Sequence, residues 1–133
     1  MSVTYSDDSY HWNDVQTIDM PKAPWELVHI GNCGSPIEVP EGWLILTHGA
    51  GAVREYAIGA ILVDKEDPTK VLGRLDEPLL KASEEERNGY VPNVVYSCGG
   101  LIHAGRLILP YGVSDWRIRF ASVHVAELVS ALV

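Results

Sequence analysis

An internal repeat limits the possible folds of this chain more than any other feature of its sequence. Residues 32–51 read NCGSPIEVPEGWLILTHGAG, and residues 93–115 read NVVYSCGGLIHAGRLILPYGVSD. Placing Gly42 on Gly105, 63 residues later, brings the apolar runs of the two segments into line, and the Cys-Gly pairs upstream align at a spacing of 65 residues. Short apolar runs that alternate with turns and recur along a chain are typical of stacked β-sheet units. The sequence therefore predicts two related antiparallel units.

The apolar runs between turn residues define the strands that we expect. They cover residues 3–6, 27–30, 35–39, 43–48, 56–63, 71–75, 94–97, 101–103, 106–111 and 117–123. Residues 43–48 are apolar at nearly every position, which predicts a strand at the centre of its sheet that ends at Gly49–Gly51. Residues 13–26 contain two prolines and little periodicity, so we expect a connection there. Apolar residues at helical spacing predict a short helix over residues 125–133.

These elements predict an all-β fold with a single domain over residues 1–133. Residues 1–30 supply edge strands and a connection, 31–76 a first unit, 77–91 a solvated acidic loop, and 92–133 a second unit with the terminal helix. Units of four short antiparallel strands are the blades of β-propellers, which close with typically about 4–8 blades. Because the chain holds material for about two blades, we expect a partial β-propeller. Its unpaired edge strands favour a homo-oligomer that completes the propeller.

Composition excludes several classes of partner. The net charge of −8 argues against nucleic acid, whose phosphates require a basic face, and against an anionic membrane surface. No apolar run approaches the roughly 20 residues that span a bilayer. The first ten residues lack the positively charged and apolar regions of a signal peptide, which favours a cytoplasmic protein.

The histidines and cysteines show no motif for a metal site or a nucleophile. The histidines at positions 11, 29, 48, 103 and 124 form no HxH or HExxH pattern. Cys33 and Cys98 have no histidine close in sequence, and we expect both to be reduced, small, buried residues at equivalent places of the two units. The sequence therefore predicts no metal and no bound cofactor.

Three long segments resemble glycoside hydrolase family 130, the family of β-mannoside phosphorylases and mannosidases. They read GNCGSPIEVPEGWLILTHG, YAIGAILVDKEDPTKVLGRLDEPLL and GYVPNVVYSCGGLIHAGRLILPYGVSD. The resemblance implies a five-bladed β-propeller with an active site at its axis, where phosphate or water displaces a sugar with inversion. It also implies that this chain corresponds to the C-terminal part of the family. The general-acid aspartate and the phosphate-binding arginine motifs belong to the N-terminal part, so no catalytic residue is assigned here.

The resemblance suggests roles for two residues at strand ends. His48 stands where the family has a histidine that contacts phosphate, and a strand-end histidine with satisfied ring nitrogens is the structural alternative. Asp115 matches a family aspartate that accepts hydrogen bonds from sugar hydroxyls. It is equally consistent with an aspartate that caps a turn beside Ser114. The bulky Trp116 that follows departs from the small residues expected in the family.

Other polar residues near the strand ends are candidates for the same site. Each has an ordinary structural role as its alternative: a core aromatic, a turn residue, a solvated charge or a surface ion pair. The candidates for substrate binding are Tyr111 (the repeat partner of His48), Asn93, Asn32 and Glu38, and the second candidate for phosphate binding is Arg54.

Two functional hypotheses follow. The first is a carbohydrate-active protein that binds an oligosaccharide or β-mannoside and uses inorganic phosphate as a possible co-substrate. The second is a non-catalytic sugar-binding or interaction module derived from such an enzyme.

Overall fold

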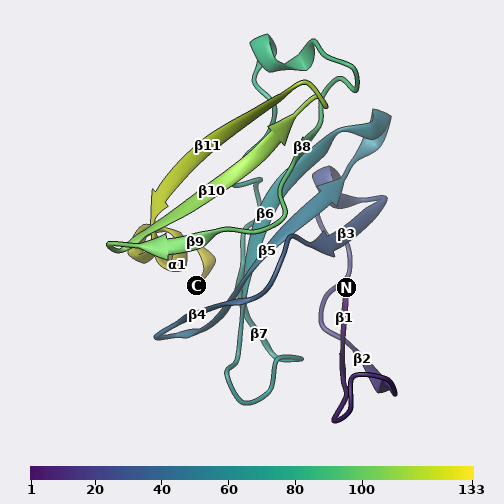
Figure 1. Cartoon of the computed structure of the whole chain (residues 1–133), viewed down its shortest axis with the longest axis vertical. Coiled ribbons are helices and arrows are strands. Elements are labelled where there is room, and N and C mark those ends of the chain that lie inside the picture. The colour runs from purple at the N-terminus through teal and green to yellow at the C-terminus, as the bar shows by residue number, and fades with distance from the viewer.

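The computed structural model describes residues 1–133 and shows antiparallel β-sheets with one short α-helix (Figure 1). This confirms the predicted all-β architecture with a terminal helix. The larger sheet has the order β3-β5-β6-β7, with β4 also paired to β5. Its strands are β3 (His29–Asn32), β4 (Ile37–Val39), β5 (Gly42–Ala50), β6 (Tyr56–Val63) and β7 (Val71–Arg74).

The smaller sheet repeats this plan with one strand fewer, and its order is β11-β10-β8 with β9 also paired to β10. It contains β8 (Val95–Tyr96), β9 (Leu101–His103), β10 (Arg106–Val113) and β11 (Arg117–His124). The helix α1 (Val125–Leu132) follows directly and lies below the ends of β9, β10 and β11 in Figure 1. A separate hairpin of β1 (Ser2–Tyr5) and β2 (Asn13–Thr17) stands at the other side of the molecule.

The first strand of each sheet is broken into two pieces that pair with the same neighbour. β3 and β4 both pair with β5, and β8 and β9 both pair with β10. Cys33-Gly34 and Cys98-Gly99 lie in these two breaks. The repeat seen in the sequence therefore corresponds to a repeated strand arrangement.

The structure corrects the detailed alignment of the repeat by one residue. Val39 pairs with Gly42 across a two-residue turn, and His103 pairs with Arg106 across another. The equivalent of Gly42 is therefore Arg106 and not Gly105. Because side chains alternate between the two faces of a strand, a shift of one residue exchanges the faces.

The core lies between the two sheets. Leu44, Leu46 and Ile58 from the larger sheet and Leu107 and Leu109 from the smaller sheet belong to one buried cluster and are at most 2% exposed. The apolar face of α1, with Leu128, Val129 and Leu132, joins the same cluster. Burial of each large apolar side chain contributes about 1.5–3 kcal/mol, so this cluster is the main force that joins the two sheets.

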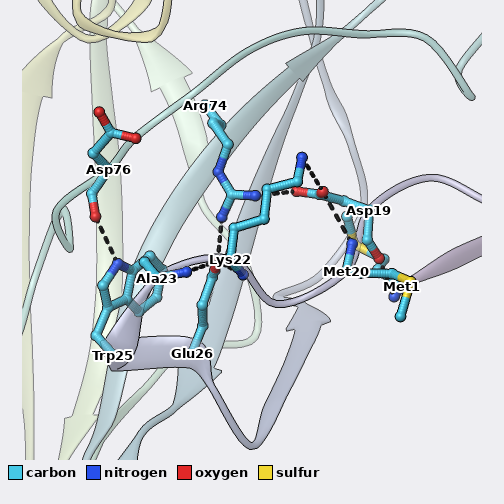
Figure 2. Close-up of polar contacts among 9 residues, drawn as sticks. All are labelled: Met1, Asp19, Met20, Lys22, Ala23, Trp25, Glu26, Arg74 and Asp76. Atoms are coloured by element: carbon cyan, nitrogen blue, oxygen red, sulfur yellow. Dashed lines mark hydrogen bonds and ion pairs between the residues drawn. The ribbon is translucent and has the colours of Figure 1, made fainter.

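The outer face of the larger sheet is covered by residues 18–28. The Trp25 ring lies over Gly49 and Gly59, where an added Cβ would approach the indole to 2.5 Å at either position. Arg74 joins this segment to β7 through ion pairs with the buried carboxylates of Asp19 and Glu26 (Figure 2). The covering segment is therefore held by a stacked aromatic ring and a buried charge cluster.

Three local predictions are wrong. Residues 13–17 form β2 instead of a connection, because all five side chains are exposed and the strand is specified only by pairing with β1. β5 continues through Gly49 to Ala50, since β3 and β6 pair with it on both sides. Cys98 is exposed, whereas only Cys33 is buried. The acidic run is exposed, as expected, and forms the 3₁₀ helix η3 (Glu84–Arg87), of which only the Glu86 side chain is largely covered, in an ion pair with Arg119.

Two further 3₁₀ turns, η1 (Pro24–Glu26) and η2 (Ala52–Arg54), complete the fold. No helix of the chain has both the length and the apolar character that a membrane span requires.

Candidate functional site

His48 lies near the C-terminal end of β5 and faces the smaller sheet, on the same side of the strand as Leu44 and Leu46. The side chain is almost completely buried, with 9% exposure. Gly31 is its partner on β3, and a Cβ there would stand 2.6 Å from the imidazole carbon Cε1. A glycine is therefore required at position 31 to leave room for the ring.

A second histidine meets His48 from the neighbouring strand. The Nε2 atoms of His29 and His48 are 2.9 Å apart, which is a hydrogen-bond distance, and the ring centroids are separated by 5.0 Å. His29 precedes Gly31 by two residues on β3, so both residues lie on the same face of the sheet. His29 is exposed, and the pair therefore connects a buried imidazole with solvent.

Two tyrosines complete an aromatic wall around His48. The ring of Tyr56, the first residue of β6, stacks on His48 at a centroid distance of 6.4 Å. Tyr96 on β8 of the smaller sheet approaches the same imidazole to 5.0 Å in a tilted arrangement. Because Tyr56 and Tyr96 belong to different sheets, the site lies where the two sheets meet.

The remaining nitrogen of His48 faces the thiol of Cys33. The distance between Cys33 Sγ and His48 Nδ1 is 3.8 Å. Burial raises the pKa of Cys33 to about 11, which keeps the sulfur protonated at neutral pH. The thiol is therefore a neutral neighbour and not an activated nucleophile.

The surroundings of His48 favour its neutral form. Burial is the main cause of its lowered pKa, and repulsion from His29 acts in the same direction, whereas a backbone hydrogen bond with Asn32 opposes them. Burial likewise raises the pKa of Tyr96, so its hydroxyl remains a hydrogen-bond donor at neutral pH. The site thus combines a neutral imidazole pair with phenol groups, and the phenol hydroxyls are the neutral donors that suit hydroxyl or oxyanion oxygens.

Asn32 and Asn93 adjoin this group through the backbone. Asn32 pairs with Thr47 in the strand register, directly next to the Gly31–His48 pair, and its side-chain amide donates to the Gly34 carbonyl. The Asn93 carbonyl accepts a hydrogen bond of 3.1 Å from the backbone N–H of Tyr56. Asn93 adopts a left-handed conformation with φ of 61°.

Asp115 and Arg54 lie in loops at the same end of the two sheets. Ser114, the neighbour of Asp115, donates its N–H to Val94, and Val94 bridges to Tyr56. Ser114 and Asp115 form the left-handed turn between β10 and β11, with φ of 51° and 50°, so Asp115 has the turn position of its structural alternative, although its exposed side chain makes no hydrogen bond. Arg54 lies in the loop between β5 and β6, is exposed, and forms no ion pair, so its surface ion-pair alternative is not realised.

Glu38 and Tyr111 lie away from His48. Glu38 pairs with Trp43 near the opposite end of β5, is exposed, and forms an ion pair of 2.9 Å with Lys65. Tyr111 belongs to the buried core and points toward the larger sheet. By the corrected alignment the equivalent of His48 is Gly112, which explains why Tyr111 does not occupy the matching place.

Sequence reasoning missed His29, Cys33, Tyr56 and Tyr96. The only signal for His29 was its position two residues before the glycine that faces His48, and this depends on the register of β3 on β5. The tyrosines come from separate strands and carried no motif. No group of three or more His, Cys, Asp or Glu side chains is arranged to hold a metal ion.

The comparisons of this chain with known proteins agree with one another. The family model described as beta-1,4-mannooligosaccharide phosphorylase matches residues 1–133. A 1,2-beta-oligomannan phosphorylase from Thermoanaerobacter sp. (strain X514) is 36% identical over 128 residues, which are 95% of this chain and 43% of that protein. A Beta-1,4-mannooligosaccharide phosphorylase from Ruminococcus albus is 34% identical over 137 residues, and the alignment covers 97% of this chain and 40% of that protein.

The fold gives the same result. The structure of a Beta-1,2-Mannobiose phosphorylase from Listeria innocua, solved with beta-1,2-mannobiose, superposes with a TM-score of 0.91 at 32% identity. The superposition covers 98% of this chain and 38% of that one. The chain thus spans about two fifths of the length of the relatives that it matches.

Proposed function

This chain belongs to glycoside hydrolase family 130. On that premise we propose that it contributes phosphate-binding and sugar-binding residues to the site of a β-mannoside phosphorylase. In this proposal the two sheets are two blades of a five-bladed β-propeller, and the end that carries His48 faces the propeller axis. The family match over residues 1–133 and the repeated arrangement of the strands support this assignment.

The reaction proposed for the site is an inverting phosphorolysis. A phosphate oxygen attacks the anomeric carbon of a mannosyl residue while an acid protonates the departing glycosidic oxygen, so that α-mannose 1-phosphate and a shortened sugar result. His48 donates a hydrogen bond to phosphate, and Arg54, in the loop that follows β5, adds positive charge. Asp115 accepts hydrogen bonds from sugar hydroxyls. The side-chain amide of Asn93 can both accept hydrogen bonds from these hydroxyls and donate to them.

The observation that carries this proposal is the position of His48. It is a nearly buried imidazole at the end of a central strand, within contact of Tyr56 and Tyr96 and at the same end of the sheets as Asn93 and Asp115. Both ring nitrogens of His48 have partners within the chain, His29 Nε2 and Cys33 Sγ, as a structural histidine would, so the ligand role rests on the strand-end position and on the family match.

For the substrate we propose β-1,2-linked mannosides. Relatives named for 1,2-linked mannan or mannobiose reach 36%, 40% and 39% identity, compared with 34% for the one named for 1,4-linked oligosaccharides. The Listeria innocua protein with the TM-score of 0.91 was likewise solved with beta-1,2-mannobiose.

We propose further that a second copy of the chain contributes to the complete site. The edge strand β11 carries Ile118 and Phe120 with exposures of 78% and 73%, and both point away from the core. The edge strand has unpaired backbone groups, and its outer face is apolar. Both features favour contact with another sheet. No carboxylate contacts His48, and the resemblance assigns the family's general acid to its N-terminal part, so turnover requires that the second copy brings another carboxylate to the site.

The direct test is incubation of the pure chain with β-1,2-mannobiose and inorganic phosphate, with detection of mannose 1-phosphate. If the assembled copies provide that carboxylate, we expect product from the wild-type chain, loss of at least about tenfold in kcat/KM for His48→Asn, and little change for His103→Asn. His103 is an exposed histidine on β9 and serves as the matched control. Wild-type turnover that survives His48→Asn would refute the role of His48.

The alternative function is a non-catalytic sugar-binding module. The absence of a carboxylate beside His48 is the observation that favours it. Saturable binding of β-1,2-mannobiose by the pure chain without release of mannose 1-phosphate would identify this alternative.

A further inference from the structure

A single proton lies in the hydrogen bond between the Nε2 atoms of His29 and His48. Each neutral imidazole has a single N–H, and two facing Nε2 atoms at 2.9 Å make a hydrogen bond only when one of them carries hydrogen and the other a lone pair. In the neutral pair, one ring therefore donates to the other. Neither Nε2 atom is then free to donate to an external ligand.

The groups around the pair do not supply a counter-charge. From β3 and the break after it come His29 itself and the Cys33 thiol, which stands 3.8 Å from His48 Nδ1. From β6 and β8 come the phenol rings of Tyr56 and Tyr96, and Cys98 lies nearby in the smaller sheet. No aspartate or glutamate forms an ion pair with either histidine, so nothing in the chain neutralises a positive charge on the pair.

An oxyanion would supply the missing charge. We propose that His29 and His48 form a proton-sharing pair that takes up one proton when an oxyanion binds to it. The inference rests on the proposed anion-binding role of His48 and adds His29 as the second donor. The Cys33 thiol and the backbone at Asn32 hold the His48 ring in place during this change.

The proton balance is simple. In the empty site the pair holds one N–H between the two Nε2 atoms. When the anion enters, this hydrogen bond opens and one proton from solvent binds to the Nε2 that acted as acceptor. Both Nε2–H groups then donate to the anion, and the pair carries one positive charge opposite the ligand.

The accessibility of His29 makes the exchange possible. Its ring is exposed at the start of β3, whereas His48 is 9% exposed, so a proton reaches the pair from solvent through His29. The neutral state of the empty site agrees with burial and repulsion from His29, which both lower the pKa of His48. Binding of an anion opposes both causes, because its negative charge stabilises the protonated imidazole.

The first experiment tests the pair without any ligand. Nitrogen-15 and proton NMR titration of the histidine rings in the 133-residue chain follows His48 in the wild type, in His29→Gln and in the control His103→Gln. We expect the pKa of His48 to rise in His29→Gln, because the positive neighbour is removed, and to stay at its wild-type value in His103→Gln. An unchanged His48 titration in His29→Gln would refute the pair.

The second experiment tests the link to anion binding. Sulfate is the probe, because it does not titrate near neutral pH, and calorimetry in two buffers with different ionisation enthalpies counts the protons taken up. We expect uptake approaching one proton per sulfate in the wild type, with affinity falling about tenfold per pH unit where the pair is neutral. In His29→Gln the proton uptake should disappear, whereas in His103→Gln it should persist.

The two ways of failing are distinct. Sulfate binding without proton uptake in the wild type would overturn this inference and leave the proposed function intact. No sulfate binding by the wild type at any pH would overturn the anion role of His48, and with it the link. Because His29 is exposed, its substitution leaves the core unchanged, and circular dichroism of each variant verifies that the fold is kept.

Discussion

The backbone of Gly34 lies directly against the carbonyl oxygen of Cys98, so closely that a Cβ at Gly34 would stand 2.2 Å from that oxygen. The same Cβ would approach Gly99 Cα to 2.7 Å. The two Cys-Gly breaks, which are equivalent in the repeat, therefore touch each other where the larger and smaller sheets meet. This contact brings the strand ends that carry His48 and Tyr96 into one site.

Gly34→Ala should destabilise the chain strongly. Gly34 has a φ of 76°, and the added methyl group meets backbone atoms that cannot move independently. We expect a loss of more than about 2 kcal/mol in the free energy of unfolding, measured by urea denaturation. Gly105→Ala is the matched control, because Gly105 has a φ of 73° but no atom within 4 Å of the added Cβ. Equal losses in the two variants would show that the sheet contact is not the cause.

Arg74→Gln should also cost stability, for an electrostatic reason. Arg74 Nη1 donates to Asp19 Oδ2 at 2.9 Å, and Nη2 donates to Glu26 Oε1 (Figure 2). Removal of the guanidinium leaves the buried carboxylate of Glu26 without a cation, whereas Asp19 keeps Lys22 at 2.9 Å, and loss of one partner of a buried ion pair typically costs about 3–5 kcal/mol. The comparison is Lys65→Gln, which breaks the exposed pair with Glu38 and should cost at most about 1 kcal/mol. A similar small loss for both variants in thermal unfolding would contradict this account.

The two cysteines should differ in reactivity. Cys98 is exposed, whereas Cys33 is 1% exposed and its pKa is raised to about 11, so the reactive thiolate of Cys33 is scarce below that pH. Treatment of the folded chain with iodoacetamide at pH 8 should give one adduct by mass spectrometry, located on Cys98. Unfolding in urea should give two. Rapid labelling of Cys33 in the folded chain would be inconsistent with its burial against His48.

Glu86 should contribute to stability in a pH-dependent way. The hydrogen bond from the Ser83 N–H is the main cause of its lowered pKa, and the nearby Arg119 guanidinium adds to it. A lowered pKa in the folded state means that this contribution is complete above the ordinary glutamate value of about 4.3 and is lost as pH falls through the folded-state value. The difference in unfolding free energy between wild type and Glu86→Gln should therefore be full at pH 7 and should shrink in acid. A difference that stays constant down to pH 2 would exclude this role.

Assembly through β11 can be tested by adding a charge to its exposed face. Phe120→Lys replaces a 73% exposed apolar ring with a cation on the edge strand, which opposes pairing with another sheet. If copies associate through this face, light scattering should show a multimer for the wild type and a monomer for Phe120→Lys. A monomeric wild type would refute association of copies and leave the individual sheets unaffected.

Much of the fold was available from the sequence because it is encoded in local patterns. The apolar run of β5 and the helical spacing in α1 each depend on neighbouring residues. β2 was missed for the opposite reason, since all its side chains are exposed and only pairing with β1 makes it a strand. The one-residue error in the alignment of the repeat had a similar origin, because the sequence does not show which residues pair across a turn.

The sequence by itself determined the family, the two related sheets and His48 as a candidate, because these depend on motifs and periodicity along the chain. Only the tertiary structure decided what surrounds His48. His29, Cys33, Tyr56 and Tyr96 come from different strands or breaks, and their meeting depends on strand register and on the contact between the two sheets. The same register removed Glu38 and Tyr111 from the group, because position along a strand and the face of a side chain are fixed by pairing across space.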